Sequence, residues 1–478
     1  MNLMKTIHRG SNIRYFDYAY VVALFVLLFL VLIRSGGLWS DFGSALPQIP
    51  IQHWLGLFIS LLGYGTVALV ALLLSRAVGR LSFLFCFNLV LFGLFFVEQL
   101  YILLQLWRWI PETGFLWAVV LALGGWVAIF QRKPAPPAIT PRVRFDPAVV
   151  IIIGWVTIAL LYFLPTNLSA ARVPYTDEGV FWYVQAADFV NIPPADRAYT
   201  RCLYSHSYGI PFISALPNLL FHCKFNHNIY YMPVILIFQI GIFLNHLRKD
   251  KWAFVFFNTA LLMTVMRHLW WRQLFLGLIY GEGIAAVFFM ILMAECWRAS
   301  RTDRAMSWPV VLLLSFGIGL LAYTKPPTSV IFFFVFPLVI LRRSLRPFQI
   351  VLFLIVLFIP ISIWMWFSPD PTFFISKISG PDSSRFGLMI EYLIKWYTAP
   401  LFFAAVSLGC ICMSFRKTEW MFLVPVLSQF LFIAWGYLFV FSQREYESAG
   451  RYIMHGMLAL YFLGSLAFSR ILSRFQPK

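Results

Sequence analysis

Apolar runs of about 20 residues recur from one end of this chain to the other, and they constrain its fold more than any other feature. A run of that length can cross the hydrocarbon core of a bilayer as an α-helix. The runs are continuous and do not alternate between apolar and polar residues, which excludes a transmembrane barrel. Only 12% of the residues are charged, whereas soluble domains are nearer to about 25%. We therefore expect an all-α polytopic membrane protein with no large soluble domain.

The apolar runs predict about 14 transmembrane helices and one further apolar segment that does not cross. The predicted spans are Tyr18–Ile33, Trp54–Leu74, Leu81–Leu104, Gly114–Phe130, Ala148–Leu164, Tyr230–Leu244, Trp252–Val265, Leu278–Trp297, Trp308–Tyr323, Ser329–Leu341, Ile350–Phe367, Ala399–Met413, Trp420–Phe441 and Tyr452–Phe468. The segment Tyr208–Phe221 is short and contains two prolines. Counting it as a span would move every later basic loop to the other side, so we interpret it as re-entrant or interfacial.

Lysine and arginine residues are distributed unequally between the two sides of this predicted topology. With both termini in the cytoplasm, the inner loops carry a net charge of +17 and the outer loops +1. Such an excess of inner basic residues is what orients a membrane protein. The formal charge of +18 therefore reflects topology, and we expect no nucleic-acid partner. The short loops favour a multi-pass protein of a bacterial inner (plasma) membrane.

A proline-rich stretch, PAPPAITPRVR, predicts the clearest internal boundary, because such stretches act as stiff linkers. We expect a four-span block (1–133), a cytoplasmic linker (134–146) and a transmembrane core (147–478) with outer loops at 165–228 and 368–397. The four-span block has few polar residues at membrane depth. Its Glu98 is expected to pair with a neighbouring polar group near the outer surface.

The second outer loop contains a stretch with helical spacing of apolar residues. Phe386, Met389, Ile390 and Leu393 recur at intervals of three and four residues, which predicts a helix lying on the membrane surface. Such a helix serves either as a lid over a bound substrate or as a plain connector.

Charged residues at the predicted outer face form four groups. They are Asp177 and Glu178 after the fifth span, Arg272 with Glu282 at the mouth of the eighth, Lys325 between two closely spaced spans, and Arg444 with Arg451 at the opening of the last. Each group alone is consistent with a snorkelling helix end. Four groups of both signs on one side are more typical of a cavity, because ionisable groups in membranes usually mark a site.

Three short motifs follow the acidic pair in a recognisable order. They are YGEGIAAVFFMILMAE with Glu282, LLAYTKPPTSV with Lys325 and GRYIMHGMLALYF with Arg451. In this order the motifs resemble the integral-membrane glycosyltransferases of the C superfamily, among them protein O-mannosyltransferases and lipid A aminoarabinose transferases. The resemblance covers roughly Ala148 to Arg470. The acidic pair here follows the fifth span, whereas in many such enzymes it follows the first. No soluble C-terminal domain is evident either, so loops would recognise the acceptor.

The resemblance implies an enzyme that moves a sugar from a polyprenyl-phosphate donor to an acceptor hydroxyl, with inversion, on the non-cytoplasmic face. The acceptor is a lipid, a glycan or a protein. One carboxylate removes the acceptor proton, and cations stabilise the leaving lipid phosphate. The resemblance implies that Asp177 is the general base and that Glu178 orients the acceptor or Asp177. Glu282 would bind the sugar or share a divalent metal with the acidic pair. The phosphate would be bound by Arg451, Arg272, Lys325 and, more weakly, Arg444.

Two other classes of function remain open on the sequence. A transporter or lipid flippase is the first alternative, although no internal repeat is evident and the charged residues lie at one face and not at mid-membrane. A polysaccharide polymerase or ligase is the second, but the nearly neutral outer loops offer little charge for a diphosphate donor. The identity of the donor would separate the transferase from the polymerase.

Overall fold

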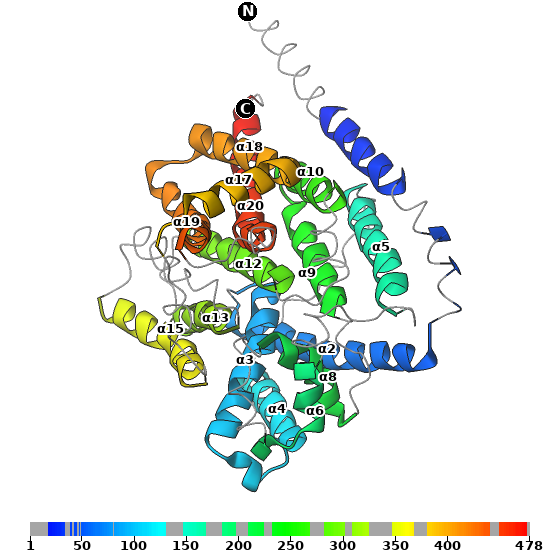
Figure 1. Cartoon of the computed structure of the whole chain (residues 1–478), viewed down its shortest axis with the longest axis vertical. Coiled ribbons are helices and arrows are strands. Elements are labelled where there is room, and N and C mark those ends of the chain that lie inside the picture. Colours follow the sequence, from blue (N-terminus) through cyan, green and yellow to red (C-terminus); the bar gives the residue numbers. More distant parts are fainter. Residues whose placement is uncertain are drawn as a thin grey trace, which may run out of the picture.

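The computed structural model describes residues 18–33, 39–40, 43–44, 47, 49–79, 81–130, 147–168, 184–196, 209–223, 232–267, 282–301, 308–324, 347–367, 380–439 and 449–475. Every regular element within these ranges is a helix, and none is a strand (Figure 1). The prediction of an all-α protein is confirmed for this part of the chain.

The helices follow the predicted spans closely. In the first half of the chain they are Tyr18–Ile33, α2 (Ile51–Val78), α3 (Phe83–Leu103), η2 (Leu106–Arg108), α4 (Glu112–Phe130), α5 (Pro147–Leu168), α6 (Val184–Asn191), α8 (Gly209–Phe221) and α9 (Met232–Leu247). In the second half they are α10 (Lys251–Arg267), α12 (Glu282–Arg301), α13 (Trp308–Thr324), α15 (Pro347–Phe367), α17 (Ser383–Trp396), α18 (Thr398–Ser414), η7 (Lys417–Phe422), α19 (Leu423–Phe439) and α20 (Ala449–Phe475).

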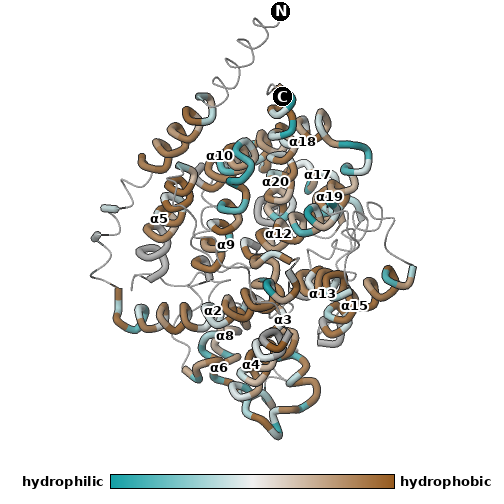
Figure 2. The backbone as a smooth tube through the Cα atoms, turned by 180° about the vertical axis from the view of Figure 1, so that it is seen from behind, coloured by the Kyte–Doolittle hydropathy of each residue, from teal (hydrophilic) through white to brown (hydrophobic). Residues whose placement is uncertain are grey.

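Several of these helices are long and apolar enough to cross a membrane. Five qualify by length and composition among the described residues, and a sixth span results if the bent pair of α17 and α18 is counted as one. Eight further apolar helices are shorter, with 10–17 residues each. Hydrophobic residues run along most of the described helices (Figure 2). This identifies a helical membrane protein, while the number of about 14 spans stays a prediction.

Helix α3 is deeply buried, with 78% of its apolar window covered by other parts of the protein. Phe92 stacks on Phe288 of α12 with a centroid distance of 5.0 Å, and Phe95 lies 5.3 Å from Phe212 of α8. The amide of Asn88 donates to Gln239 of α9 at 3.0 Å, which satisfies a polar group that burial would otherwise penalise. The N-terminal block thus packs directly against helices of the predicted core, although the linker at 134–146 lies outside the described residues.

Ion pairs join the ends of several helices at one end of the bundle. Glu419, which is 6% exposed, accepts from Arg470 of α20 at 2.7 Å and pairs with Arg301 of α12. Ser469 of α20 donates to Asp250 between α9 and α10. Because α9, α12 and α20 all finish here among arginines and lysines, we call this the basic end. It lies toward the C-terminus marked at the top of Figure 1.

Helices α5 and α9 run antiparallel, and this bears on whether α8, which lies between them in the chain, crosses the membrane. Gly241 of α9 packs on Val156 of α5, because a Cβ added to it would lie 3.3 Å from that side chain. Leu160, which is later in α5, packs in the small cluster that contains Val234, which is earlier in α9. Residue numbers therefore rise along one helix as they fall along the other. Helix α9 ends at the basic end, so α5 begins there. The chain therefore leaves α5 and enters α9 at the same end, and no net crossing occurs between them.

The packing of α8 agrees with this direction. Its 13 residues span roughly 20 Å at 1.5 Å per residue, less than the hydrocarbon thickness of about 30 Å. The Tyr64 hydroxyl of α2 donates to the Ile213 carbonyl at 3.1 Å, and the indole of Trp117 in α4 donates to Leu220. Helix α8 is buried among neighbouring helices, which favours the re-entrant reading over a helix on the surface.

Helices α13 and α15 run in the same direction. Trp308 and Phe348, at their first turns, lie 5.8 Å apart, and the Ser315 hydroxyl donates to the Phe353 carbonyl further along both helices. Two parallel neighbours need a return between them. The predicted span Ser329–Leu341 would provide that return, and it lies outside the described residues.

Helix α20 packs between α18 and α19. The Tyr461 hydroxyl donates to the Pro400 carbonyl of α18 at 3.1 Å, and Gly464 further along packs on Ser407, so α18 and α20 are parallel. Helix α19 starts at η7, beside Glu419 at the basic end, and is antiparallel to both. This order of directions matches the predicted alternation of the last three spans.

Candidate functional site

The helices next to the predicted charged groups begin or end at the end opposite to the basic end. Helix α5 starts at the basic end and finishes at Leu168. Helix α10 starts there too, because Trp252 contacts Phe468 and Thr264 bonds Tyr461, so α10 runs antiparallel to α20. Six residues separate the end of α12 from the start of α13. We call the other end, where α5 and α10 finish and α12 and α20 begin, the opposite end.

The predicted site residues belong to the chain segments that adjoin these helix ends. Asp177, Glu178, Arg272, Lys325 and Arg444 lie outside the described residues. Each one follows or precedes a helix with an end of known position: α5 before the acidic pair, α10 before Arg272, α13 before Lys325 and α20 after Arg444.

Two predicted site residues belong to described helices, although their side chains are not described. Glu282 opens α12, and Arg451 lies in the first turn of α20. The guanidinium of Arg470 lies 5.1 Å from the Trp297 ring, so the two helices are in register there. Counting back at 1.5 Å per residue gives about 22 Å from Trp297 to Glu282 and about 28 Å from Arg470 to Arg451. Glu282 and Arg451 therefore lie at similar depth.

Glu98 is a buried carboxylate of the described chain near the same end. It is 0% exposed, and the side-chain amide of Gln99 donates to it, which confirms the expected polar neighbour. Phe92 lies opposite Phe288 on the antiparallel α12. Six residues further along α3 and six back along α12 lead to Glu98 and Glu282, so these two backbone positions are level with each other. From the sequence we expected a pairing role for Glu98 and did not include it among the site residues.

His455 is a second residue that the sequence did not single out. It follows Arg451 by four residues on α20, so the two share one helix face, and its side chain is fully buried. The spacing alone was a usable signal, but a histidine in an apolar helix is as often a packing residue.

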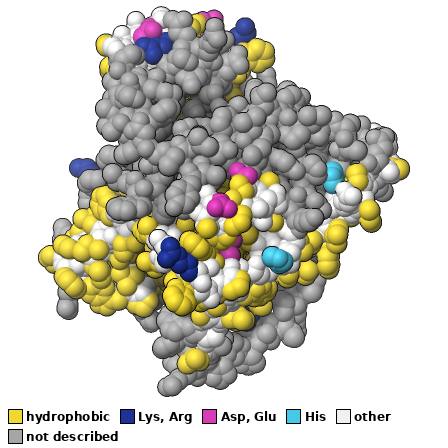
Figure 3. Space-filling model, turned by 60° about the horizontal axis from the view of Figure 1, so that its bottom comes forward, with side chains coloured by type: hydrophobic (Ala, Val, Ile, Leu, Met, Phe, Trp, Pro, Cys, Tyr) yellow, Lys and Arg dark blue, Asp and Glu magenta, His cyan; other side chains and the backbone are white. Residues whose placement is uncertain are grey.

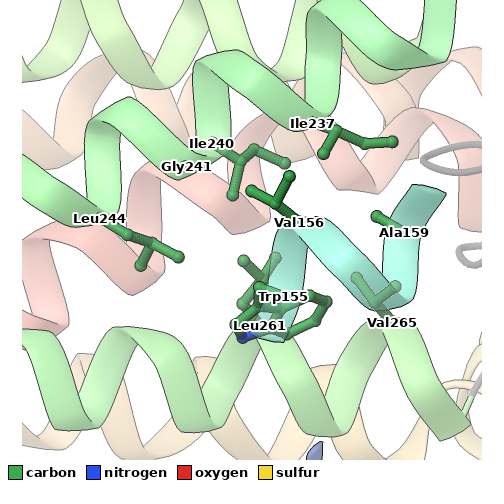
Figure 4. A pocket seen from close by; sticks show the side chains of 9 residues that line it. All are labelled: Trp155, Val156, Ala159, Ile237, Ile240, Gly241, Leu244, Leu261 and Val265. Atoms are coloured by element: carbon green, nitrogen blue, oxygen red, sulfur yellow. The ribbon is translucent and has the colours of Figure 1, made fainter. Parts of the chain in front are cut away.

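An apolar groove lies between α5, α9 and α10. The chain continues from α5 to Asp177 and from α10 to Arg272. The free volume of the groove is only about 20 Å³, which is room for about one water molecule. Figure 4 shows its lining, which consists of Trp155, Val156, Ala159, Ile237, Ile240, Gly241, Leu244, Leu261 and Val265. The polar atom of Trp155 is used by a hydrogen bond to Asn258. The groove therefore presents hydrocarbon surface, which suits an apolar chain.

The described part of the chain contains no group of three or more His, Cys, Asp or Glu side chains that could hold a metal ion. The predicted acidic pair lies outside it, and so the shared divalent metal stays a prediction. In Figure 3, which brings the lower side of Figure 1 forward, the described surface is largely hydrophobic with a few acidic, basic and histidine side chains.

Comparison of the chain with protein-family models, with curated proteins and with solved structures gives no match.

Proposed function

We propose that the protein is an integral-membrane glycosyltransferase that moves a sugar from a polyprenyl-phosphate donor to an acceptor hydroxyl on the non-cytoplasmic face. The observation that carries the proposal is the common position of the helix ends. The segments with Asp177, Arg272, Glu282 and Arg451 adjoin helices that begin or finish at the end opposite to the basic end. Carboxylates and cations in one region are what this reaction needs.

The proposed chemistry divides between the two signs of charge. Asp177 takes the proton of the acceptor hydroxyl as the oxygen attacks the anomeric carbon, and Glu178 orients the acceptor or Asp177. The bond between the anomeric carbon and the phosphate oxygen breaks, and polyprenyl phosphate leaves with both bonding electrons. Arg451, Arg272 and Lys325 stabilise the negative charge on that phosphate, with Arg444 as a weaker fourth. Glu282 binds sugar hydroxyls or shares a divalent metal with the acidic pair.

The groove between α5, α9 and α10 offers an apolar surface next to the proposed site. Its walls are apolar, and the helices that form two of them lead to Asp177 and Arg272. Its free volume of about 20 Å³ is too small to enclose a prenyl chain, so in this proposal the chain lies along the groove from the lipid side, with its phosphate toward the end where the proposed cations lie.

The positive-inside distribution supports a non-cytoplasmic site. Arginines and lysines gather at the basic end, beside Glu419 and Asp250, and such residues favour the cytoplasmic side. The proposed site is at the other end. The proposal therefore places both termini in the cytoplasm of a bacterial inner membrane.

The test is release of polyprenyl phosphate from a panel of prenyl-phosphate sugars by purified protein in lipid. The parent protein is expected to turn over at least one donor, and Asp177→Asn is expected to release none. Asp196→Asn is the matched control, because Asp196 is an exposed carboxylate of the same outer loop. An impermeant thiol reagent should label a cysteine at position 177 from the non-cytoplasmic side only.

Four results would contradict the proposal. Full transfer by Asp177→Asn would reject the base assignment. Labelling from the cytoplasmic side would reject the topology. If the parent turned over no prenyl-phosphate sugar, while an outward position 177 was established, a transporter or flippase would become the better explanation. Turnover of diphosphate-linked oligosaccharides alone would point to a polymerase or ligase.

A further inference from the structure

Helix α17 meets α18 at a bend of 92°. The bend is held by specific contacts, because Tyr397 between the helices is 0% exposed and its backbone N–H donates to the Leu393 carbonyl at 2.8 Å. Thr398 donates to the Ile394 carbonyl at 3.1 Å. If α18 crosses the membrane, α17 therefore lies close to the plane of the membrane.

The start of α17 is level with the first turn of α20. Phe430 of α19 packs on Gly456 of α20. Helix α19 then continues for eight residues to Leu438, whose carbonyl accepts from the Asp382 N–H at 3.0 Å. Helix α20 runs antiparallel to α19, so the matching position on α20 is eight residues before Gly456, which is where α20 begins. Helix α17 is thus at the opposite end of the bundle, at the depth where the helices emerge.

Three different faces follow from the burial of the α17 side chains. Met389 and Leu393, four residues apart, are 3% and 7% exposed and face the protein. This corrects the expectation that these two residues face the membrane. Ile390 and Ile394 form a second face and are 38% and 61% exposed.

The third face is mainly polar. Ser384, Glu391 and Lys395 are spaced by seven and four residues and are exposed, so they share one side of the helix. Leu388, which is 39% exposed, lies among them. The ammonium of Lys395 also lies 5.5 Å from the Trp396 ring. A helix with a protein face, an exposed apolar face and a polar face fits the boundary between lipid and water.

Two of the helices that contact α17 also expose apolar side chains. Phe402 of α18 is 60% exposed, and Leu431 and Trp435 of α19 are 70% and 39% exposed. Apolar side chains of such helices face lipid when no other helix covers them. Ile390 and Ile394 lie at the end of the bundle, where a lipid-facing surface has its edge and where tryptophan is frequent.

We propose that α17 docks on the outer lipid surface, with Ile390 and Ile394 inserted at the boundary of headgroups and acyl chains and with Glu391 and Lys395 in water. The helix thereby sets the headgroup level of the outer leaflet at the first turn of α20, where Arg451 lies. This docking does not depend on the proposed sugar transfer, and its test needs no substrate.

The experiment uses nitroxide labels on single cysteines of the full chain in phosphatidylcholine vesicles, in a background with the exposed Cys412 replaced by serine. Ile390→Cys and Ile394→Cys report on the apolar face, and Ser384→Cys and Glu391→Cys report on the polar face. Collisions with oxygen, which concentrates in lipid, should dominate at positions 390 and 394. Collisions with a water-soluble nickel chelate should dominate at positions 384 and 391.

Two outcomes would overturn the proposal. If all four labels collide mainly with the nickel chelate, α17 stands in water. If labels at 390 and 394 exclude both reagents, a second copy of the chain or another protein covers the face. A variant sharpens the result: Ile394→Lys should reduce oxygen collisions at position 390, while Glu391→Gln should leave them unchanged. Ile394 is mostly exposed, so its replacement spares the packing of the helix.

Discussion

The two ends of the bundle differ in how they hold ionisable side chains. At the basic end, carboxylates have cationic partners among the described residues: Glu419 pairs with Arg301 and Arg470, and Glu295 pairs with Arg298 at 2.6 Å. Three helix ends are joined by these pairs. At the opposite end, the described ion pair of Asp382 and Arg385 at 2.7 Å lies within the first turn of α17 and does not join one helix to another. The predicted site charges there come from segments adjoining α5, α10, α12, α13 and α20.

The difference indicates different purposes for charge in one protein. Buried charges that are paired within the protein hold helices in register, and loss of one partner leaves the other unpaired. Charges meant for a substrate must be left available to it. Substitutions at the basic end should therefore change stability, and substitutions at the opposite end should change activity.

The largest expected effect is on catalysis and comes from Arg451→Ala. Removing a cation that stabilises the leaving phosphate should lower turnover about 10²–10³-fold, as loss of one transition-state donor does elsewhere. The thermal unfolding midpoint should stay close to that of the parent. Arg474→Ala is the control, since Arg474 is an exposed arginine near the other end of the same helix. Equal losses of activity in both variants would remove the distinction between the ends.

Glu419→Gln should have the reverse outcome. Arg470 and Arg301 would lose a buried anionic partner, and we expect the unfolding free energy to fall by about 2 kcal/mol. This is below the full cost of breaking a buried pair, because the Arg301 side chain is 47% exposed and solvent screens it. The measurement is chemical or thermal unfolding in lipid, with turnover expressed per folded molecule.

The control for Glu419→Gln is Glu391→Gln, which changes an exposed carboxylate of α17 and should not alter stability measurably. A stability loss of the same size in both variants would mean that Glu419 does not hold α12 and α20 together. A selective loss of turnover in Glu419→Gln, with stability intact, would contradict its structural role.

Ala159→Phe tests whether the groove connects the lipid phase to the opposite end. Ala159 is 2% exposed, and the added ring is larger than the free volume of about 20 Å³ between α5, α9 and α10, so the unfolding midpoint is measured beside the kinetics. In the folded variant the KM for long-chain prenyl-phosphate sugars should rise roughly tenfold, equivalent to about 1.4 kcal/mol. A donor with a very short prenyl chain should be unaffected. Ile153→Phe is the matched control, because Ile153 of α5 is 59% exposed and lies outside the groove. Equal effects on short and long donors would reject the groove as a chain site.

The class of protein and the alternating directions of the helices could be predicted from the sequence, because apolar length and basic loops encode both. The sequence did not distinguish α2 from α3. Both are apolar on all sides, yet 39% of one and 78% of the other is buried in their apolar windows. A uniformly apolar helix has no polar face to mark which side meets lipid, so burial depends on its neighbours.

The sequence also failed where a contact depends on distant partners. Glu419 looked like one more charge in a short inner loop, but it joins α12 to α20 across 118 and 51 residues of chain. In α17 the apolar spacing predicted the helix correctly and its lipid face only in part. Met389 and Leu393 pack on the protein, because the bend at Tyr397 turns them inward.

The smallest expected effect is at the start of α17. The Asp382 carboxylate accepts from the N–H groups of Ser384 and Arg385 at 2.9 and 3.2 Å, and it caps the helix. Hydrogen bonding, first of all from the Ser384 hydroxyl, lowers the pKa of Asp382 to about 2. Asp382→Ala should speed amide hydrogen exchange in the first turn of α17 and leave α18 unchanged.

The sign of the pH dependence follows from the lowered pKa of Asp382. The contribution of the cap is fully present above the ordinary aspartate pKa of about 3.9 and is lost as the pH falls toward 2. Exchange in this turn, corrected for the intrinsic rate, should therefore be constant above about pH 4 and rise only below it. Asp382→Asn keeps a capping oxygen, so it should retain most of the protection without this pH dependence. If Asp382→Ala also loosened α18, the bend and the cap would be one cooperative unit, and α17 could not move independently of the bundle.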